Sequence, residues 1–381
     1  MKRFFSYTIL SFFLLLLPTG QASANNNDST RLSLLTCAPG EEIYSLFGHT
    51  AIRYENPSQG IDIVFNYGLF SFNTPNFIFR FSLGETDYQL GATDYERFAA
   101  EYAFFGRSVW QQTLNLTDEE KTELIRLLQE NYRPENRVYR YNFFYDNCAT
   151  RPRDKIEESI AGKVIYPAEP QDGSLTFRDI VHQYCKGHPW ARFGIDLCIG
   201  SEADQPITQR QMMFAPFYLM DAFDGAQIKG DSIQRPLITA NELVVDATPE
   251  PDESDWMPTP LQCSLLLFIL TAAATIYGIR RRTGLWGIDL FLFGIAGIVG
   301  CVLAFLALFS QHPAVSSNFL LLVFHPGQLL FLPYIIYCVR KGKKCWYLTL
   351  NLAVLTLFIV LFPVIPQRFD FAVVPLALVL L

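Results

Sequence analysis

The sequence lacks the features by which several classes of protein are recognised. Its net charge is −7, so it offers no basic surface for nucleic acid. It contains no long-period internal repeat and no low-complexity tract. It also has no pair of residues at zinc-ligand spacing, such as Cys-x-x-Cys or His-x-x-x-His. We therefore expect no nucleic-acid partner, no metal site and no cofactor.

What the sequence does contain is an uneven distribution of apolar residues. The chain has 381 residues, of which 50% are hydrophobic, including 33 Phe and 18 Tyr. The first two thirds have the composition of a soluble domain, whereas the last third is apolar enough for a membrane. The length allows two or three domains.

Residues 1–24 have the pattern of a secretory signal peptide. Lys2 and Arg3 form a charged start, residues 9–17 an apolar core, and residues 22–24 (Ala-Ser-Ala) a small-residue cleavage site. An uncleaved anchor helix is the alternative, although the apolar run is short for a span. No cysteine stands at the cleavage site, so the chain is not itself an obvious lipoprotein. Either way, the following residues are expected outside the cytoplasm.

The last third predicts a helical membrane domain, residues 261–381, with four to five spans. An acidic, proline-rich linker, residues 248–260, precedes it. The apolar runs are long enough to cross a bilayer. The predicted spans are residues 261–279, 288–309, 319–339 and 346–365, and residues 371–381 form a half-span or an incomplete fifth helix.

Two basic clusters, residues 280–282 and 340–344, set the expected orientation of these spans. Such clusters favour the cytoplasmic side. The exported domain, the loop of residues 310–318 and residues 366–370 are then expected on the opposite side. We predict an inner (cytoplasmic) membrane protein with several spans and a periplasmic N-terminal domain.

The exported domain, residues 25–247, mixes strand and helix patterns, which favours an α+β fold. Residues 117–120 (Thr-Asp-Glu-Glu) form a capping box at a helix start. The predicted strands are residues 31–36, 50–54, 62–70, 109–116 and 138–145, and the predicted helices include residues 94–105 and 117–132.

Cys148 is the candidate nucleophile of this domain. An alternating aromatic run, residues 141–145, ends in Asp146 and Asn147, which are good N-cap residues. A helix is therefore expected to begin at or just before Cys148. The positive end of a helix lowers the pKa of a thiol and favours the thiolate.

Disulfide bonding is the main alternative for Cys148. After removal of the signal peptide, the exported domain holds four cysteines, Cys37, Cys148, Cys185 and Cys198. An even number in an oxidising compartment is compatible with two disulfides. A bond between Cys37 and Cys148 would leave no nucleophile, and Cys185 could pair with Cys198.

His49 is the candidate base, because it follows a glycine at the entry of a predicted strand. Asn66, on the neighbouring strand, could orient its imidazole. His182 on a predicted helix and His188 in a loop are expected to be structural or exposed. Arg53, Arg151 and Arg153 are candidate contacts for an anionic or lipid headgroup, with local ion pairs as the alternative.

These residues carry a family resemblance. Residues 48–53 (Gly-His-Thr-Ala-Ile-Arg), residues 66–70 (Asn-Tyr-Gly-Leu-Phe) and residues 146–151 (Asp-Asn-Cys-Ala-Thr-Arg) together resemble the Lnb N-terminal periplasmic domain family. The order of His and then Asn-Cys also resembles circularly permuted NlpC/P60 and lecithin-retinol-acyltransferase-like proteins. The resemblance implies a circularly permuted papain-like domain and covers nearly the whole exported part.

The resemblance also implies an activity, because Lnb-type proteins of the Bacteroides group are lipoprotein N-acyltransferases. Cys148 would take an acyl group from a phospholipid as a thioester, with His49 as general base and Asn66 as its orienter. The α-amine of a diacylglyceryl-cysteine lipoprotein would then accept it. Backbone N–H groups at Cys148 and its helix turn would form an oxyanion hole. A cell-wall cysteine peptidase and a disulfide-stapled membrane scaffold are the alternatives.

Overall fold

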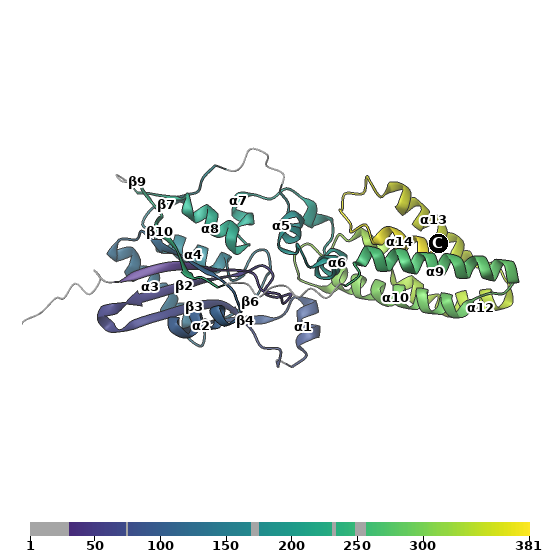
Figure 1. Ribbon diagram of the computed structural model, residues 1–381, viewed down its shortest axis with the longest axis horizontal. Coiled ribbons are helices and arrows are strands. Elements are labelled where there is room, and N and C mark those ends of the chain that lie inside the picture. The colour runs from purple at the N-terminus through teal and green to yellow at the C-terminus, as the bar shows by residue number, and fades with distance from the viewer. Residues whose placement is uncertain (1–29, 74, 169–174, 231–233, 248–256) are drawn as a thin grey trace, which may run out of the picture.

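The computed structural model describes residues 30–73, 75–168, 175–230, 234–247 and 257–381. An α+β head and a helical bundle lie side by side along the long axis of the molecule (Figure 1). The predicted signal peptide and most of the predicted linker lie outside the described residues.

The centre of the head is a seven-stranded antiparallel sheet with the strand order β10-β5-β1-β2-β3-β4-β6. Its strands are β1 (Arg31–Cys37), β2 (His49–Asn56), β3 (Ile61–Leu69), β4 (Asp87–Asp94), β5 (Val109–Leu114), β6 (Val138–Arg140) and β10 (Ile238–Val245). A second, three-stranded sheet consists of β7 (Lys163–Ile165), β8 (Gln227–Lys229) and β9 (Gln234–Pro236).

Helices cover both faces of the large sheet. Because successive side chains of a strand point to opposite faces of the sheet, β1 contributes side chains to the packing on both faces. Leu32 and Leu34 pack with α3, α4 and α8, whereas Leu35 and Cys37 pack with α2. The helices of the head are α1 (Phe77–Leu83), α2 (Tyr95–Phe104), α3 (Asp118–Tyr132), α4 (Thr150–Ser159), α5 (Phe177–Tyr184), α6 (Pro189–Cys198), α7 (Gln209–Met212) and α8 (Pro216–Asp224), with short 3₁₀ turns η1 (Pro57–Gln59) and η2 (Ser201–Asp204).

Most of the predicted elements of the head are confirmed to within two residues, but one strand is wrong. The run of residues 138–145 is extended only in β6, which ends at Arg140. The side chain of Asn142 accepts the backbone N–H groups of Phe144 and Tyr145, which bends the chain. The aromatic rings that suggested a strand pack in a loop instead, and the ring of Phe144 stacks on Phe177.

The bundle contains fewer full-length apolar helices than the number of spans predicted. By length and composition, α9 and α10 can cross a membrane, and η3 to α12 would add a third span that is bent by 73°. Its elements are α9 (Pro260–Arg281), α10 (Trp286–Phe309), η3 (Phe319–Leu322), α11 (Pro326–Leu330), α12 (Leu332–Lys341), α13 (Trp346–Leu361) and α14 (Val373–Val379). The predicted count of four to five spans stays a prediction.

The two ends of the bundle differ as the basic clusters predicted. A Cβ on Gly284 would lie 3.0 Å from Val339 Cγ1, so the two basic clusters share one end. At the other end, the N–H groups of Gly200 and Ser201 donate to the carbonyls of Ala314 and Ser317 at 2.7 and 2.9 Å. The head therefore contacts the loop of residues 310–318, on the side opposite the basic clusters.

A buried arginine of the head, Arg178, is the centre of an ion-pair network that reaches this end of the bundle through Asp204. Its Nη1 lies 2.6 Å from Asp196 Oδ1, and its Nε lies 2.9 Å from Asp204 Oδ1. The side chain is fully buried, and Nη2 also donates to two backbone carbonyls. Arg368 of the bundle binds the same Asp204 and also Asp179. The network thus spans both parts of the molecule.

Replacing Arg178 with methionine should strongly destabilise the protein. Without the guanidinium, the buried Asp196 loses its arginine partner and Asp204 keeps only Arg368, and removing one member of such a buried network costs about 3–5 kcal/mol. We expect a clearly lower thermal midpoint of the detergent-solubilised chain, followed by intrinsic fluorescence. Arg126→Met, which breaks an exposed ion pair with Glu123, is the control and should leave the midpoint unchanged. Equal midpoints for the two variants would contradict this role of Arg178.

Candidate active site

The turn that presents Cys148 is built around the buried side chain of Asn147. Its Oδ1 accepts the backbone N–H groups of Ala149 and Thr150 at 2.8 and 3.0 Å. Its Nδ2 donates to the carbonyls of Phe143 and Phe214 at 2.8 and 2.9 Å. The helix α4 begins at Thr150, so Cys148 lies in the turn just before the helix.

Cys148 is partly accessible and lies against the end of the β2–β3 pair. The backbone N–H groups of Thr50 and of Cys148 itself donate to its sulfur. A Cβ built on Gly68 would lie 3.5 Å from Cys148 Cβ, and Gly68 has a φ of +92°, which side chains rarely adopt. The glycine in the 66–70 motif therefore leaves room beside the nucleophile.

His49 is the first residue of β2, and its Nε2 lies 3.1 Å from Asn66 Oδ1 on β3. Because a carbonyl oxygen only accepts, Nε2 carries the proton of the neutral ring and Nδ1 holds the lone pair. Gly48 precedes it with a φ of +77°, and a Cβ there would lie 2.6 Å from the backbone oxygen of Cys37. Close backbone packing thus requires glycine at position 48, just before His49.

The structure gathers the three predicted catalytic residues at one end of the β2–β3 pair. His49 bonds to Asn66, and the next residue, Thr50, donates its backbone N–H to Cys148. The predicted orientation of the imidazole by Asn66 has the expected hydrogen bond. The catalytic roles of the three residues stay predictions.

Burial dominates the protonation of both candidate groups. It raises the pKa of the Cys148 thiol to about 11, although the two N–H donors at the sulfur act to lower it. It lowers the pKa of His49 to about 4, against the opposing effect of the hydrogen bond to Asn66. The predicted lowering of the thiol pKa is therefore wrong, because Asn147 already occupies the first N–H groups of the helix. Both the thiol of Cys148 and the imidazole of His49 are therefore neutral in the resting site.

The same hydrogen bonds change the predicted oxyanion hole. The N–H groups of Ala149 and Thr150 donate to Asn147, so of the three only the N–H of Cys148 is left near the thiol. A residue that sequence reasoning missed, Tyr139 on β6, has a buried hydroxyl with no hydrogen-bond partner among the described residues. That hydroxyl lies 4.0 Å from the Cβ position of Gly68, next to Cys148.

The three predicted headgroup arginines all have partners within the head. Arg53 makes a two-point ion pair with Asp62 at 2.8 and 2.7 Å. Arg151 does the same with Asp146 at 2.6 and 2.7 Å, and its guanidinium lies 3.6 Å from the ring centre of Tyr139. Their predicted contact with substrate stays a prediction, and their present contacts are structural.

Arg153 is buried, and it binds Asp154 and the backbone oxygen of Arg210. All eight cysteines are free thiols in the structure. The two candidate disulfides, Cys37 with Cys148 and Cys185 with Cys198, are therefore not formed.

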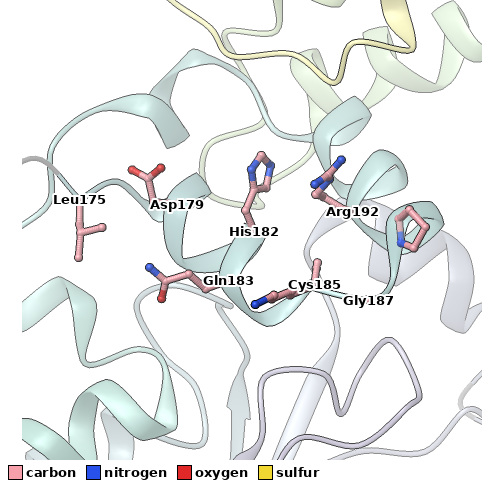
Figure 2. A pocket seen from close by; sticks show the side chains of 9 residues that line it. Leu175, Asp179, His182, Gln183, Cys185, Gly187 and Arg192 are labelled. Atoms are coloured by element: carbon pink, nitrogen blue, oxygen red, sulfur yellow. The ribbon is translucent and has the colours of Figure 1, made fainter. Parts of the chain in front are cut away.

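Two cavities flank the junction of the head and the bundle, and neither is lined by Cys148 or His49. One, of about 400 Å³, lies between α5 and α6 and is lined in part by His182, Lys186 and Arg192. Figure 2 shows the side chains of His182 and Arg192 on the same side of α5. His182 binds Asp196 at 2.9 Å, which agrees with its predicted structural role. The other cavity, of about 880 Å³, lies between α1 and α10.

Comparison with known families accounts for most of the chain. Residues 20–182 match the Lnb N-terminal periplasmic domain, and residues 252–381 match the Lnb transmembrane domain. No curated protein and no solved structure matches the chain. The first match contains His49, Asn66 and Cys148, and the second contains the helical bundle. The protein is therefore a membrane protein with a periplasmic head, and it belongs to the Lnb family.

Proposed function

We propose that the protein is a lipoprotein N-acyltransferase that works through a thioester on Cys148. The observation that carries the proposal is the position of the thiol. Its sulfur accepts the N–H of Thr50, the residue after His49, at the end of the β2–β3 pair that carries the hydrogen-bonded His49 and Asn66, in a head held against one end of apolar helices. A phospholipid of the adjoining leaflet is then the acyl donor, and a diacylglyceryl lipoprotein is the acceptor. We take the membrane to be the cytoplasmic membrane, with the head on its periplasmic side.

In the first half-reaction, Cys148 Sγ attacks the carbonyl carbon of a phospholipid ester. His49 Nδ1 takes the thiol proton as the S–C bond forms. The ester C–O bond breaks, and the leaving oxygen of the lysophospholipid takes the proton from the imidazolium. Since both groups rest neutral, the proton moves only when the substrate is in place. Asn66 holds Nε2–H, so that Nδ1 keeps its lone pair.

In the second half-reaction, the free α-amine of the diacylglyceryl-cysteine attacks the thioester carbonyl. The N–C bond forms and the C–S bond breaks, which yields an amide. The neutral imidazole of His49 accepts a proton from the amine and returns it to the departing sulfur. The thiol is restored, and no cofactor enters either half-reaction.

Negative charge on the carbonyl oxygen needs hydrogen-bond donors in both half-reactions. The N–H of Cys148 supplies one donor. We assign the second to the hydroxyl of Tyr139, because it is buried, unpartnered within the described residues and adjacent to Gly68 and Cys148. The pairing of Arg151 over the Tyr139 ring holds the ring in place.

Intact-mass spectrometry of the membrane-extracted protein tests the thioester. We expect a fatty-acyl adduct on the wild type that neutral hydroxylamine releases, no thioester on Cys148→Ser, and acylation slowed about 10²- to 10⁴-fold in His49→Ala. Cys198→Ser and His188→Ala are the matched controls and should keep the adduct. An unacylated Cys148 in a disulfide would support the scaffold instead. A free thiol that never acylates but cleaves cell-wall fragments would support the peptidase.

Replacing Tyr139 with phenylalanine separates catalysis from stability. The hydroxyl has no partner among the described residues, so its loss should leave the thermal midpoint unchanged or slightly raised. The acylation rate should fall about 10²-fold, as expected for one oxyanion donor. Tyr67→Phe is the control, because the Tyr67 hydroxyl donates to Asn131 Oδ1 at 2.7 Å. That control should lose stability and keep its rate. An unchanged rate in Tyr139→Phe would remove Tyr139 from the reaction.

The pH dependence of acylation follows from the lowered pKa of His49. Above about pH 4 the imidazole is neutral and can accept the thiol proton, and below it the base is lost. We expect the acid limb of the acylation rate near pH 4, well below the ordinary histidine value of about 6.5. The rate at which iodoacetamide alkylates Cys148 should still increase with pH at pH 9, because the thiolate is the reactive form and the thiol pKa is about 11. An acid limb near 6.5 would show that His49 is not buried in this way.

A further inference from the structure

The cavity between α1 and α10 is lined by apolar side chains from both parts of the molecule. It measures about 880 Å³, within the roughly 300–1,000 Å³ range of ligand pockets. Its lining includes Phe72, Phe77, Phe79, Cys301, Val302 and Phe305. Because α10 is long and apolar enough to span a membrane, the medium around this part of the helix is lipid.

The groove has fixed walls, because backbone contacts hold α1 against the end of α10. The N–H of Gln311 donates to the carbonyl of Leu83 at 2.8 Å, and His312 Nε2 donates to the carbonyl of Phe81 at 2.5 Å. A ring contact of 5.9 Å joins Phe79 to Phe305 across the groove. In Figure 1, α1 lies at the side of the head that faces the bundle.

The surface of α1 is unusually apolar for a periplasmic domain. Phe72 is 63% exposed, Ile78 81% and Phe79 59%. Side chains of this kind at a membrane boundary are buried by lipid rather than left in water. Lipid of the leaflet that borders the head would cover these exposed side chains.

A continuous series of ring contacts connects this groove to the nucleophile. Cys148 packs in the same core cluster as Tyr88, Tyr141 and Phe70. Tyr141 stacks on Tyr88 at 4.1 Å, and Tyr88 contacts Phe70 at 4.9 Å. Phe70 in turn contacts Phe77, which lines the groove, at 5.8 Å. An aromatic path of packed side chains thus extends from the core cluster that Cys148 packs against to the lipid-facing helix.

We propose that this groove, called here the α1–α10 groove, holds the fatty acyl chain that is esterified to Cys148 and selects its length. The proposal rests on the proposed function, since it gives the acyl chain that is transferred a binding site in this groove. The occupant is one acyl chain of the donor phospholipid, which enters from the leaflet with its ester end at Cys148. The aromatic path excludes water along the chain.

Narrowing the groove should shift the preferred chain towards shorter lengths. Val302 is 53% exposed and lines the groove, so Val302→Trp fills it without disturbing a buried core. Each methylene that loses its contact should weaken binding about fourfold. The matched control is Ile295→Trp, which adds the same side chain at an exposed position of α10 that does not line the groove.

The experiment offers full-length protein in nanodiscs a mixture of phosphatidylethanolamines of different chain lengths. Intact mass gives the chain found on Cys148. We expect Val302→Trp to favour a chain at least two methylenes shorter than the wild type, by tenfold or more, and Ile295→Trp to match the wild type. Identical chain distributions in the two tryptophan variants would overturn the groove while leaving the acyltransferase intact.

A second readout does not depend on acyl transfer. Cys148→Ala protein is irradiated with a phosphatidylethanolamine that carries a diazirine at the end of one chain. We expect labelling of α1 and of residues 301–306, reduced several-fold by adding Val302→Trp and unaffected by adding Ile295→Trp. Labelling of Cys148→Ala with this pattern, together with a wild type that never carries an acyl chain, would keep the groove and refute the transferase. Labelling that neither substitution alters marks only bulk lipid and overturns the groove.

Discussion

The candidate site depends on the buried side chain of Asn147. One amide group satisfies two donors in the turn after Cys148 and two acceptors from segments 4 and 67 residues away. A buried amide with all of its partners specifies a single local geometry, because any shift leaves a polar group unpaired. The turn therefore cannot relax into a longer helix, and Cys148 stays outside the first turn of α4. The position of the nucleophile and the loss of two oxyanion donors have the same cause.

This arrangement explains why the thiol is not preactivated. A helix start lowers a thiol pKa only if its N–H groups and its dipole are free to act on the sulfur. Here two of those groups serve Asn147, and burial outweighs the remaining donors. A neutral thiol also suits a site next to lipid, since a buried thiolate would have to be desolvated before any substrate arrived. In the proposed reaction, activation of the thiol is left to His49, whose lowered pKa keeps the imidazole unprotonated at neutral pH.

Much of the head could be predicted from local pattern, because its strands alternate and its helices carry clear capping residues. Thr117 caps α3 through the reciprocal bonds that the sequence suggested. The failures have different physical causes. The aromatic residues after β6 repeat with the period of a strand, but Asn142 turns the chain and Phe144 packs against Phe177 of a distant helix. The role proposed for Tyr139 depends on the tertiary position of its hydroxyl, and no local pattern encodes that position. Gly68 could be recognised as part of a motif from the sequence. The reason why glycine is needed there is its φ of +92° beside Cys148, which only the three-dimensional structure shows.

The junction between the head and the bundle determines how far the thiol lies from the lipid. The contacts that define it include the Arg178–Asp204–Arg368 network on one side and the hydrogen bonds of α1 with residues 311 and 312 on the other. With a contact on each side, the head cannot rock about a single hinge without breaking buried or backbone hydrogen bonds. The proposed reaction, between a lipid ester and a lipid-anchored amine, needs such a fixed height, because neither of these substrates would leave the membrane. On that proposal, the rigidity of the junction supplies the proximity that a soluble acyltransferase obtains by binding its substrates from solution.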